Sequence, residues 1–288
     1  MFTETTLDLL TKCHQALLPG RQIQYLAFPT VFPKCDFDGS NDHVAHEVSS
    51  HSGAAGLMLV HPSMSAEHIG ATLRSGHFLG FKCYRYYSVT GDTLECRITD
   101  FLPERQIAIA ERHGLIIMLH LAKLKACADP ANLADLRYLS GKYPRVHWIL
   151  AHCARSFTPH PIEKVGRLLR ELPNIWIDTS AVCESASFSA LFETFGTERV
   201  LYGSDSPRVG MARGKYVAVG QGWMGVDQEI TGSIKSRVTD LGLTFYAYES
   251  LRALRYAARW AKLSRKQTEA LFHDNASRLI ETVRLLQI

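Results

Sequence analysis

Short runs of apolar residues alternate with helical patterns along most of this chain, and no other feature of the sequence constrains the fold as strongly. The runs are typical of buried strands, and the stretches between them carry apolar residues at helical spacing. Such alternation predicts a parallel sheet covered by helices on both faces. The predicted strands cover residues 23–31, 55–60, 78–84, 115–120, 146–152 and 175–179, and a last strand begins at Val200.

A helix is predicted after almost every strand, as in a (β/α)8 TIM barrel. The closed barrel has eight strands, so the pattern leaves one strand unaccounted for. We see no interdomain linker, and residues 1–288 are therefore expected to form a single barrel domain. A Gly-rich insert at about residues 209–239, which contains Trp223, interrupts the pattern. A loop of this length is usually functional; we expect a lid over the site or a contact in a homodimer, and favour the lid.

Composition narrows the function classes. The apolar fraction of 46% and the charged fraction of 21% are those of a soluble globular protein. The net charge of +4 is spread along the chain without a block of like charges, which argues against a nucleic-acid partner. No apolar run approaches the roughly 18 residues of a membrane span, and residues 1–4 do not open a signal peptide. We expect a cytoplasmic protein, with its cysteines as free thiols.

Three strands end in side chains that bind metals or move protons. Two of the predicted strands end in His120 and His152, and Asp205 follows the strand that begins at Val200. Open α/β sheets and α/β barrels build their active sites at the carboxyl ends of strands. Taken alone, a histidine at the end of a strand is more often a structural residue than a catalytic one. The segment around Asp205, Gly-Ser-Asp-Ser-Pro, likewise has the composition of an ordinary turn. Their joint occurrence favours a site for metal-assisted or acid–base chemistry.

Cationic side chains follow several of the same strands. Arg85 and Tyr86 follow the strand at residues 78–84, Arg155 follows His152, and Arg208 follows Asp205. Arginine binds carboxylates through paired hydrogen bonds, so these residues predict an anionic small-molecule substrate. For any single one of these residues, a solvent-exposed position on a basic surface without a ligand is an equally good interpretation.

The chain resembles the amidohydrolase superfamily, in the branch that contains aminocarboxymuconate-semialdehyde decarboxylase, resorcylate-type decarboxylases and sugar or pyrone-dicarboxylate lactonases. The resemblance spans about residues 5 to 285, and its most specific part is the segment that holds Asp205. The segments that carry it are 119–120 (Leu-His), 150–153 (Leu-Ala-His-Cys), 174–180 (Asn-Ile-Trp-Ile-Asp-Thr-Ser), 201–207 (Leu-Tyr-Gly-Ser-Asp-Ser-Pro) and 274–279 (Asp-Asn-Ala-Ser-Arg-Leu).

The resemblance implies a (β/α)8 barrel and a role for each matching residue. His120 is expected to bind a divalent metal ion, and Asp205 to bind the same ion and relay a proton. His152 is expected to be the acid/base group that activates or orients the metal-bound water, or a second ligand. Zinc, at one ion per chain, is the expected metal. Two-metal relatives carry a carboxylated lysine at the position of Lys82, for which we favour a structural role at the strand end.

One departure from the family is serious. The family's first strand ends in His-x-His, which supplies two ligands, and this sequence contains no His-x-His. Two explanations are open. The chain could begin downstream of the true N-terminus, or the protein could be a natural variant with an incomplete metal site. We favour the first explanation because the sequence opens directly at the position of the family's first helix. In the variant, Asp205 would be the general base of a metal-independent lactonase, with the histidines polarising the carbonyl, or the barrel would be inactive.

The sequence therefore predicts a (β/α)8 barrel enzyme that lacks its first strand. Its expected activity is metal-dependent hydrolysis of a small carboxylated or lactone-type metabolite, with water activated at a mononuclear site. Non-oxidative decarboxylation at the same residues is the alternative, followed by the metal-independent lactonase and the inactive barrel.

Overall fold

The computed structural model describes residues 5–227 and 242–286. The chain divides into two compact units. The first unit consists of Met1–Lys123, Asp135–Trp148 and Ile280–Ile288, and the second of Leu124–Ala134 and Ile149–Leu279. Strand β6 (His147–Leu150) contributes its first two residues to the first unit and its last two to the second.

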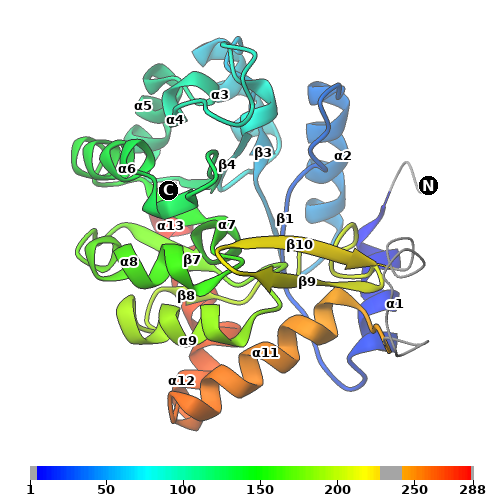
Figure 1. The fold of residues 1–288 in the computed structure, drawn as a ribbon. Helices are drawn as coiled ribbons and strands as arrows, with labels where there is room; N and C mark the ends of the chain where they lie inside the picture. Colours follow the sequence, from blue (N-terminus) through cyan, green and yellow to red (C-terminus); the bar gives the residue numbers. More distant parts are fainter. Residues whose placement is uncertain (1–4, 228–241, 287–288) are drawn as a thin grey trace. The chain divides into compact units, whose positions relative to one another are not determined.

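The first unit alternates strands and helices in the predicted order (Figure 1). Its strands are β1 (Tyr25–Ala27), β2 (Ala54–Gly56), β3 (Met58–Leu59), β4 (Gly80–Tyr84) and β5 (Ile116–His120). Its helices are α1 (Leu7–Leu17), α2 (Phe37–Ser50), α3 (Ala66–Ser75), η1 (Arg85–Tyr87), α4 (Ile98–Phe101) and α5 (Glu104–His113). Strand β1 pairs in parallel with β2, β3 with β4, and β4 with β5.

The second unit continues the alternation and adds a hairpin. Its further strands are β7 (Ile175–Asp178), β8 (Val200–Leu201), β9 (Gly214–Val219) and β10 (Gly222–Asp227). Its helices are η2 (Ala126–Ala128), α7 (Ala151–Arg155), α8 (Pro159–Arg170), α9 (Ser185–Thr194), α11 (Tyr246–Trp260), α12 (Arg265–Glu269) and the π-helical η3 (Ala270–Asp274). Helices α6 (Pro130–Lys142) and α13 (Asn275–Leu286) cross the division between the units. Strand β7 lies between β6 and β8 and pairs in parallel with β8.

Burial explains why the strands read as continuous apolar runs. All residues of β5 and β7 are buried, and all but the last residue of β4. A parallel strand covered on both faces has no solvent side that could accept polar residues, so apolar side chains fill it. The close approach of β4 and β5 also requires glycine at position 80, because a Cβ on Gly80 would lie 1.9 Å from the carbonyl oxygen of Ile116.

Every predicted strand is present, and the differences lie at the ends of elements. Helix α2 begins at Phe37, because the side chain of Asp36 caps it by accepting from the Gly39 amide. Strand β6 ends at Leu150, so the prediction that His152 closes this strand is wrong. Lys82 does not cap a strand end either: it lies within β4 and is 4% exposed.

The Gly-rich insert is not a plain loop. Residues 214–227 of it form the antiparallel hairpin β9–β10, in which Trp223 pairs with Ala218 and Gly225 with Tyr216. The remainder of the predicted insert from residue 228 onward lies outside the described residues, as do residues 1–4, on which the signal-peptide prediction rests.

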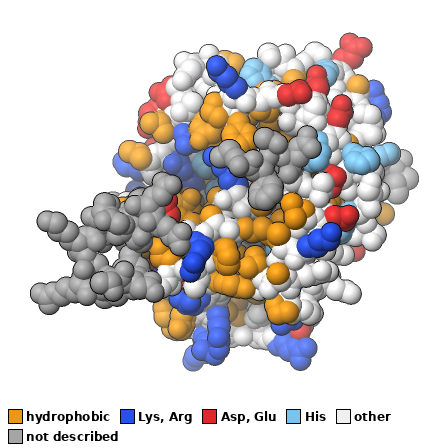
Figure 2. Space-filling model, turned by 90° about the vertical axis from the view of Figure 1, so that its right-hand side faces the viewer, with side chains coloured by type: hydrophobic (Ala, Val, Ile, Leu, Met, Phe, Trp, Pro, Cys, Tyr) orange, Lys and Arg blue, Asp and Glu red, His pale blue; other side chains and the backbone are white. Residues whose placement is uncertain are grey.

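The surface carries all classes of side chain. Figure 2 shows one face, on which Lys and Arg and also Asp and Glu are scattered among hydrophobic side chains. Within the described part of the chain, no helix combines the length and apolarity needed to cross a membrane. The seven cysteines are free, as predicted, and five of them are buried.

Candidate active site

His152 lies in a turn of reversed handedness directly after β6. The backbone of His152, Cys153 and Ala154 has φ of 60°, 55° and 54° with ψ of 54°, 41° and 37°, and Arg155 follows with φ of 64°. L-residues avoid this left-handed region, at a cost of about 1–2 kcal/mol each. Such a run persists only where surrounding contacts fix it, and backbone strain of this kind is concentrated at functional sites.

The contacts that fix this turn come from the end of β7. Asp178 Oδ1 accepts three hydrogen bonds: from the His152 amide at 2.9 Å, the Ser180 amide at 2.9 Å and Ser180 Oγ at 2.6 Å. Asp178 and Ser180 are both buried. A buried carboxylate that accepts several hydrogen bonds holds its partners firmly, because each bond is assisted by its charge.

The same network determines the tautomer of His152. Its Nδ1 lies 2.9 Å from Ser180 Oγ and 3.1 Å from the Ser180 carbonyl oxygen. A carbonyl oxygen can only accept, and the Ser180 hydroxyl proton is directed to Asp178, so Nδ1 must carry the proton and donate it. In the neutral imidazole, Nε2 is then the unprotonated nitrogen and can act as a base.

Cys153, the neighbour of His152, is not a nucleophile in this arrangement. The thiol is fully buried, and burial raises its pKa well above the ordinary value, with the Asp178 carboxylate and Cys127 raising it further. A thiol that stays protonated is a poor nucleophile.

Asp205 follows β8 in the same unit. Its φ is 52°, and its carbonyl accepts from the amides of Val209 and Gly210. Gly203 brings this segment against the β7 end, because a Cβ there would lie 3.1 Å from the Ser180 Cβ. His152 and Asp205 thus follow the carboxyl ends of two strands that flank β7, the geometry in which parallel sheets place catalytic groups.

Asp205 also acts on the hairpin. Burial raises the pKa of Tyr216, and the Asp205 carboxylate raises it further together with Cys183, while Arg208 lowers it. The charges of Asp205 and Arg208 therefore both act on the Tyr216 phenol. Arg208 itself is exposed.

His120 belongs to the first unit and has different surroundings. It pairs with Tyr84 across β4 and β5, and the two rings lie 4.5 Å apart. Its Nδ1 lies 3.2 Å from the Leu121 carbonyl oxygen. Lys82 stands two residues before Tyr84 on the same face of β4, with its Nζ 4.9 Å from the Phe28 ring and 5.8 Å from the Tyr84 ring. His120 is thus positioned by aromatic packing beside a buried cation.

The other predicted substrate anchors differ in exposure. Arg85 donates to the Thr93 carbonyl oxygen and lies 5.5 Å from the Tyr86 ring, so it is partly engaged with its own loop. Tyr86 is exposed, and Arg155 in the left-handed turn is half-buried. Their role in binding a substrate stays a prediction.

A complete metal site is not found within either unit. Among the described residues of each, no three His, Cys, Asp or Glu side chains are grouped so that they could hold an ion. The predicted ligands His120 and Asp205 belong to different units, and a catalytic zinc takes three protein ligands. The described geometry of the second unit by itself supports acid–base chemistry by side chains.

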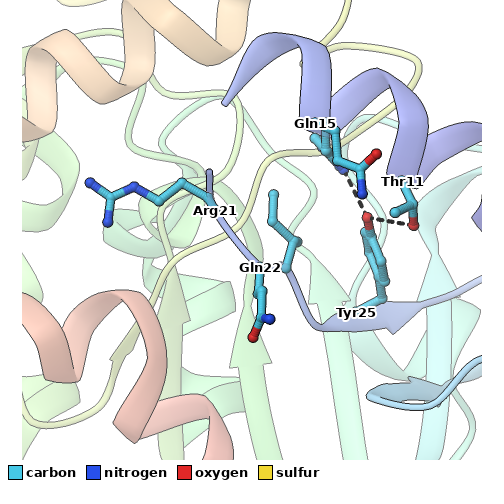
Figure 3. Close-up of a pocket in the computed structure, with 7 residues that line it drawn as sticks. Thr11, Gln15, Arg21, Gln22 and Tyr25 are labelled. Carbon is cyan, nitrogen blue, oxygen red and sulfur yellow. Dashed lines mark hydrogen bonds between the residues drawn. The ribbon is translucent and has the colours of Figure 1, made fainter. Parts of the chain in front are cut away.

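A polar cavity lies elsewhere in the first unit, between α1 and the segment that leads into β1 (Figure 3). Its volume is about 160 Å³. At its wall the Tyr25 hydroxyl lies 3.1 Å from Thr11 Oγ1 and 3.2 Å from His14 Nδ1. None of the predicted site residues lines it.

Sequence reasoning missed the residues that hold His152. Asp178 and Ser180 stand in a segment that carried the family resemblance, yet no role was assigned to them. A signal existed, since Asp178 is a carboxylate at the end of an otherwise apolar predicted strand. Tyr216 was missed because it lies in the insert, where no periodicity pointed to a strand.

Comparison with known proteins identifies the family. Residues 16–281 match the family model described as Amidohydrolase. Among the curated proteins, none matches the chain by sequence. One similar solved structure is an amidohydrolase from Burkholderia multivorans with bound zinc, at a TM-score of 0.60 and 14% identity over 96% of this chain and 88% of the other.

Two further structures show the same fold at low identity. An uncharacterised TIM-barrel protein from Bordetella bronchiseptica has a TM-score of 0.56 and 13% identity, over 97% of this chain and 84% of its own. The 2,6-dihydroxybenzoate decarboxylase from Rhizobium has a TM-score of 0.52 and 12% identity, over 85% and 77%. The predicted α/β TIM-barrel class is confirmed, and the chain belongs to the amidohydrolase family, as an enzyme of the amidohydrolase-related type.

Proposed function

We propose that the protein hydrolyses a small carboxylated or lactone-type molecule with water that His152 and Asp205 activate. The observation that carries this proposal is the chain of hydrogen bonds from Asp178 through Ser180 to His152 Nδ1. It fixes the tautomer in which Nε2 accepts a proton, and buried Asp178 stabilises the imidazolium that forms. A histidine held in this way can serve as a general base.

The steps follow from these roles. His152 Nε2 takes a proton from water as the oxygen attacks the substrate carbonyl, and the same nitrogen returns the proton to the leaving oxygen. Asp205, an anion at the neighbouring strand end, orients the water and is the second proton acceptor. Arg208, an exposed guanidinium three residues after Asp205, is suited to the substrate carboxylate.

Decarboxylation is the second candidate, and the likeness to the Rhizobium 2,6-dihydroxybenzoate decarboxylase favours it. In that reaction the protonated His152 or Asp205 would deliver the proton to the carbon that loses carbon dioxide. The same side chains serve both reactions, so the products must decide between them.

The metal is a separate part of the proposal. The Burkholderia amidohydrolase binds zinc, which supports a divalent ion in this enzyme as well. Metal analysis of the purified protein is expected to find about one ion per chain, the stoichiometry of a single catalytic zinc site. A protein that turns over without any bound ion would instead be the metal-independent lactonase.

The decisive experiment assays the full chain with carboxylated lactones and with aromatic carboxylic acids. Ring-opened acid and released carbon dioxide are measured in the same reactions, which separates hydrolase from decarboxylase. The variant Asp205→Asn should lose turnover of the active substrate by about 10²- to 10⁴-fold, as removal of an acid–base group does. Unchanged turnover in this variant would refute the role given to Asp205.

A further inference from the structure

The polar cavity between α1 and the segment that leads into β1 is lined by side chains that have no proposed catalytic role. From α1 come Thr11, His14 and Gln15, and from the following segment come Arg21 and Gln22 (Figure 3). The cavity volume of about 160 Å³ is several times the roughly 30 Å³ that one water molecule occupies, so an ion of a few heavy atoms fits. All of these residues belong to the first unit.

A chain of hydrogen bonds begins at the wall of this cavity and ends at a second histidine. His14 Nδ1 lies 3.2 Å from the Tyr25 hydroxyl, which lies 3.1 Å from Thr11 Oγ1. Thr11 Oγ1 in turn lies 3.3 Å from Nε2 of His51, the residue that follows α2. The Tyr25 ring packs against both imidazoles, with ring centroids 5.7 Å from His14 and 5.5 Å from His51. These contacts hold the His14 ring in one orientation.

The His51 end of the chain determines the direction in which its protons are donated. The Nδ1 atom of His51 is buried and has no hydrogen-bond partner among the described residues. A buried N–H group without an acceptor is rare, so the His51 proton belongs on Nε2, which donates to Thr11. The Thr11 hydroxyl then donates to Tyr25, and the Tyr25 hydroxyl donates to His14 Nδ1.

His14 therefore presents an N–H group to the cavity. Burial lowers the pKa of His14 from 6.5, so the ring is neutral at neutral pH and carries a single proton. Because Nδ1 accepts from Tyr25, this proton lies on Nε2, which has no partner among the described residues. Only 7% of His14 is exposed, so its Nε2–H is a largely buried donor that calls for an acceptor in the cavity.

The rest of the lining favours an anion as that acceptor. Within residues 5–227 and 242–286, the side chains of Gln15, Arg21 and Gln22 have no hydrogen-bond or ion-pair partner, and no carboxylate from these ranges lines the cavity. Two amides and a guanidinium supply more N–H donors than acceptors. The Arg21 side chain is exposed and extends away from Tyr25 (Figure 3). Exposed side chains change rotamer within nanoseconds, so its guanidinium is free to turn toward a bound anion.

We propose that this cavity binds a small oxyanion through the Nε2–H of His14 and the side-chain amide of Gln15, with the guanidinium of Arg21 closing over it. Hydrogen bonds to a charged acceptor are about twice as strong as those between neutral groups. The site is additional to the proposed active site and does not depend on the reaction assigned there, because none of the residues given a catalytic role lines the cavity.

The test follows NMR signals of the His14 ring and the Gln15 side-chain amide in the full chain, so that an anion bound elsewhere does not obscure the result. Without added anion, the His14 proton is expected on Nε2. Sulfate and acetate, each added at constant ionic strength, should shift both signals with dissociation constants of about 1–10 mM. The ion that binds more tightly shows whether the site prefers a tetrahedral or a planar group. Dimethyl sulfone and acetamide, neutral molecules of similar size, should leave both signals unchanged.

Arg21→Gln removes an exposed charge and should weaken anion binding about two- to fivefold, the contribution expected of such a charge. Arg74→Gln is the matched control, because Arg74 near the end of α3 is also exposed and lies outside the cavity; it should bind as the unaltered protein does. His14→Phe keeps a ring beside Tyr25 without the Nε2–H and should abolish the shift of the Gln15 amide.

Four outcomes would each overturn the proposal. They are unshifted signals with both anions at tens of millimolar (an affinity below roughly −2 kcal/mol), equal shifts with the neutral analogues, equal binding by the two arginine variants, and a His14 proton on Nδ1. Loss of turnover in the active-site variants leaves all of these measurements unaffected, so the proposed reaction and the anion site fail separately.

Discussion

The two units hold their strand-end histidines by different means. In the first unit, His120 is the last residue of a regular strand and rests against Tyr84, beside the buried ammonium of Lys82. In the second, His152 lies beyond its strand in a left-handed turn, fixed by hydrogen bonds to Asp178 and Ser180. Both rings place Nδ1 near a backbone carbonyl oxygen, at 3.2 Å for His120 and 3.1 Å for His152. His152 is linked in addition through Ser180 Oγ to the buried carboxylate of Asp178, and this link is the basis of the acid–base role that we propose for it.

The largest expected effect distinguishes the two histidines directly. His152→Asn should lower kcat by about 10²- to 10⁴-fold, as removal of a general base does. His120→Asn should lower kcat by less than this. Measurements of kcat and of urea unfolding on both variants make the comparison, and equal losses of kcat at equal stability would contradict it.

The next effect concerns the carboxylate behind His152. Asp178→Asn weakens three buried hydrogen bonds and removes the charge that stabilises a protonated His152, so we expect kcat to fall by about 10- to 100-fold and stability by about 1–3 kcal/mol. Urea unfolding and kcat are measured together.

A carboxylate in the first unit supplies the control. Asp135 is also buried and accepts from Arg97 Nε at 2.9 Å, from Arg97 Nη2 and from the Ile98 amide at 3.3 Å. Asp135→Asn should cost a comparable 1–3 kcal/mol, roughly, without lowering kcat. Equal losses of kcat in the two variants would show that Asp178 acts through stability alone.

Ser180 tests the link between Asp178 and His152. Ser180→Ala removes one acceptor of Nδ1 but leaves the carbonyl oxygen of the same residue, so a smaller loss of kcat, about tenfold or less, is expected. Ser180→Thr keeps the hydroxyl and should restore most of the activity. If the alanine and threonine variants were equally impaired, crowding in the turn would be the cause rather than the lost hydroxyl.

The strain in the turn gives a smaller effect of opposite sign. Ala154 has φ of 54°, where glycine has no steric cost, so Ala154→Gly should raise stability by up to about 1 kcal/mol. Ala151 begins the same helix without reversed dihedrals, and Ala151→Gly should lower stability by about 0.5–1 kcal/mol. Thermal unfolding of both variants measures the difference, and two changes of the same sign would exclude strain at Ala154.

The smallest effect is the response to acid. Burial lowers the pKa of His14, His61 and His147 from 6.5, and all three lie in the first unit. The unfolded chain then binds more protons than the folded one, so their contribution to stability is complete above pH 6.5 and is lost as the pH falls below it. Protection factors, which correct amide exchange for its intrinsic dependence on pH, should therefore fall more in the first unit than in the second between pH 7 and pH 5, and His14→Gln should reduce the change.

Much of the fold could be predicted from the sequence, because a buried parallel strand must be apolar throughout and helices must separate it from the next. Strand order and the positions of His120 and Asp205 after their strands follow from this pattern. The left-handed turn could not be predicted, since the segment Ala-His-Cys-Ala-Arg at residues 151–155 contains no glycine, the residue that usually indicates positive φ angles. Its cause is a contact from Asp178, distant in sequence, and local patterns do not carry such contacts.

The hairpin escaped prediction for a related reason. Gly214, Gly220, Gly222 and Gly225 suggested irregular chain, yet Gly225 faces the Tyr216 ring and Gly214 faces Tyr246, so two of these glycines make room for aromatic neighbours. A Cβ on Gly214 would lie 2.5 Å from Tyr246 Cε2. A glycine in a strand can thus indicate that a large aromatic ring packs beside it. This relation can be recognised only when the pairing of the strands is known.

The reversed turn after β6 has a consequence for anyone who redesigns this protein. Positive φ angles over four residues turn the chain in the direction opposite to an ordinary helical start, so an idealised backbone with a common βα connection would not reproduce the direction of the His152 side chain. Grafting the histidine, serine and aspartate onto a regularised scaffold would reproduce the composition of the relay but not its geometry. Transplanting its chemistry requires the awkward stereochemistry of residues 152–155 to be transplanted as well.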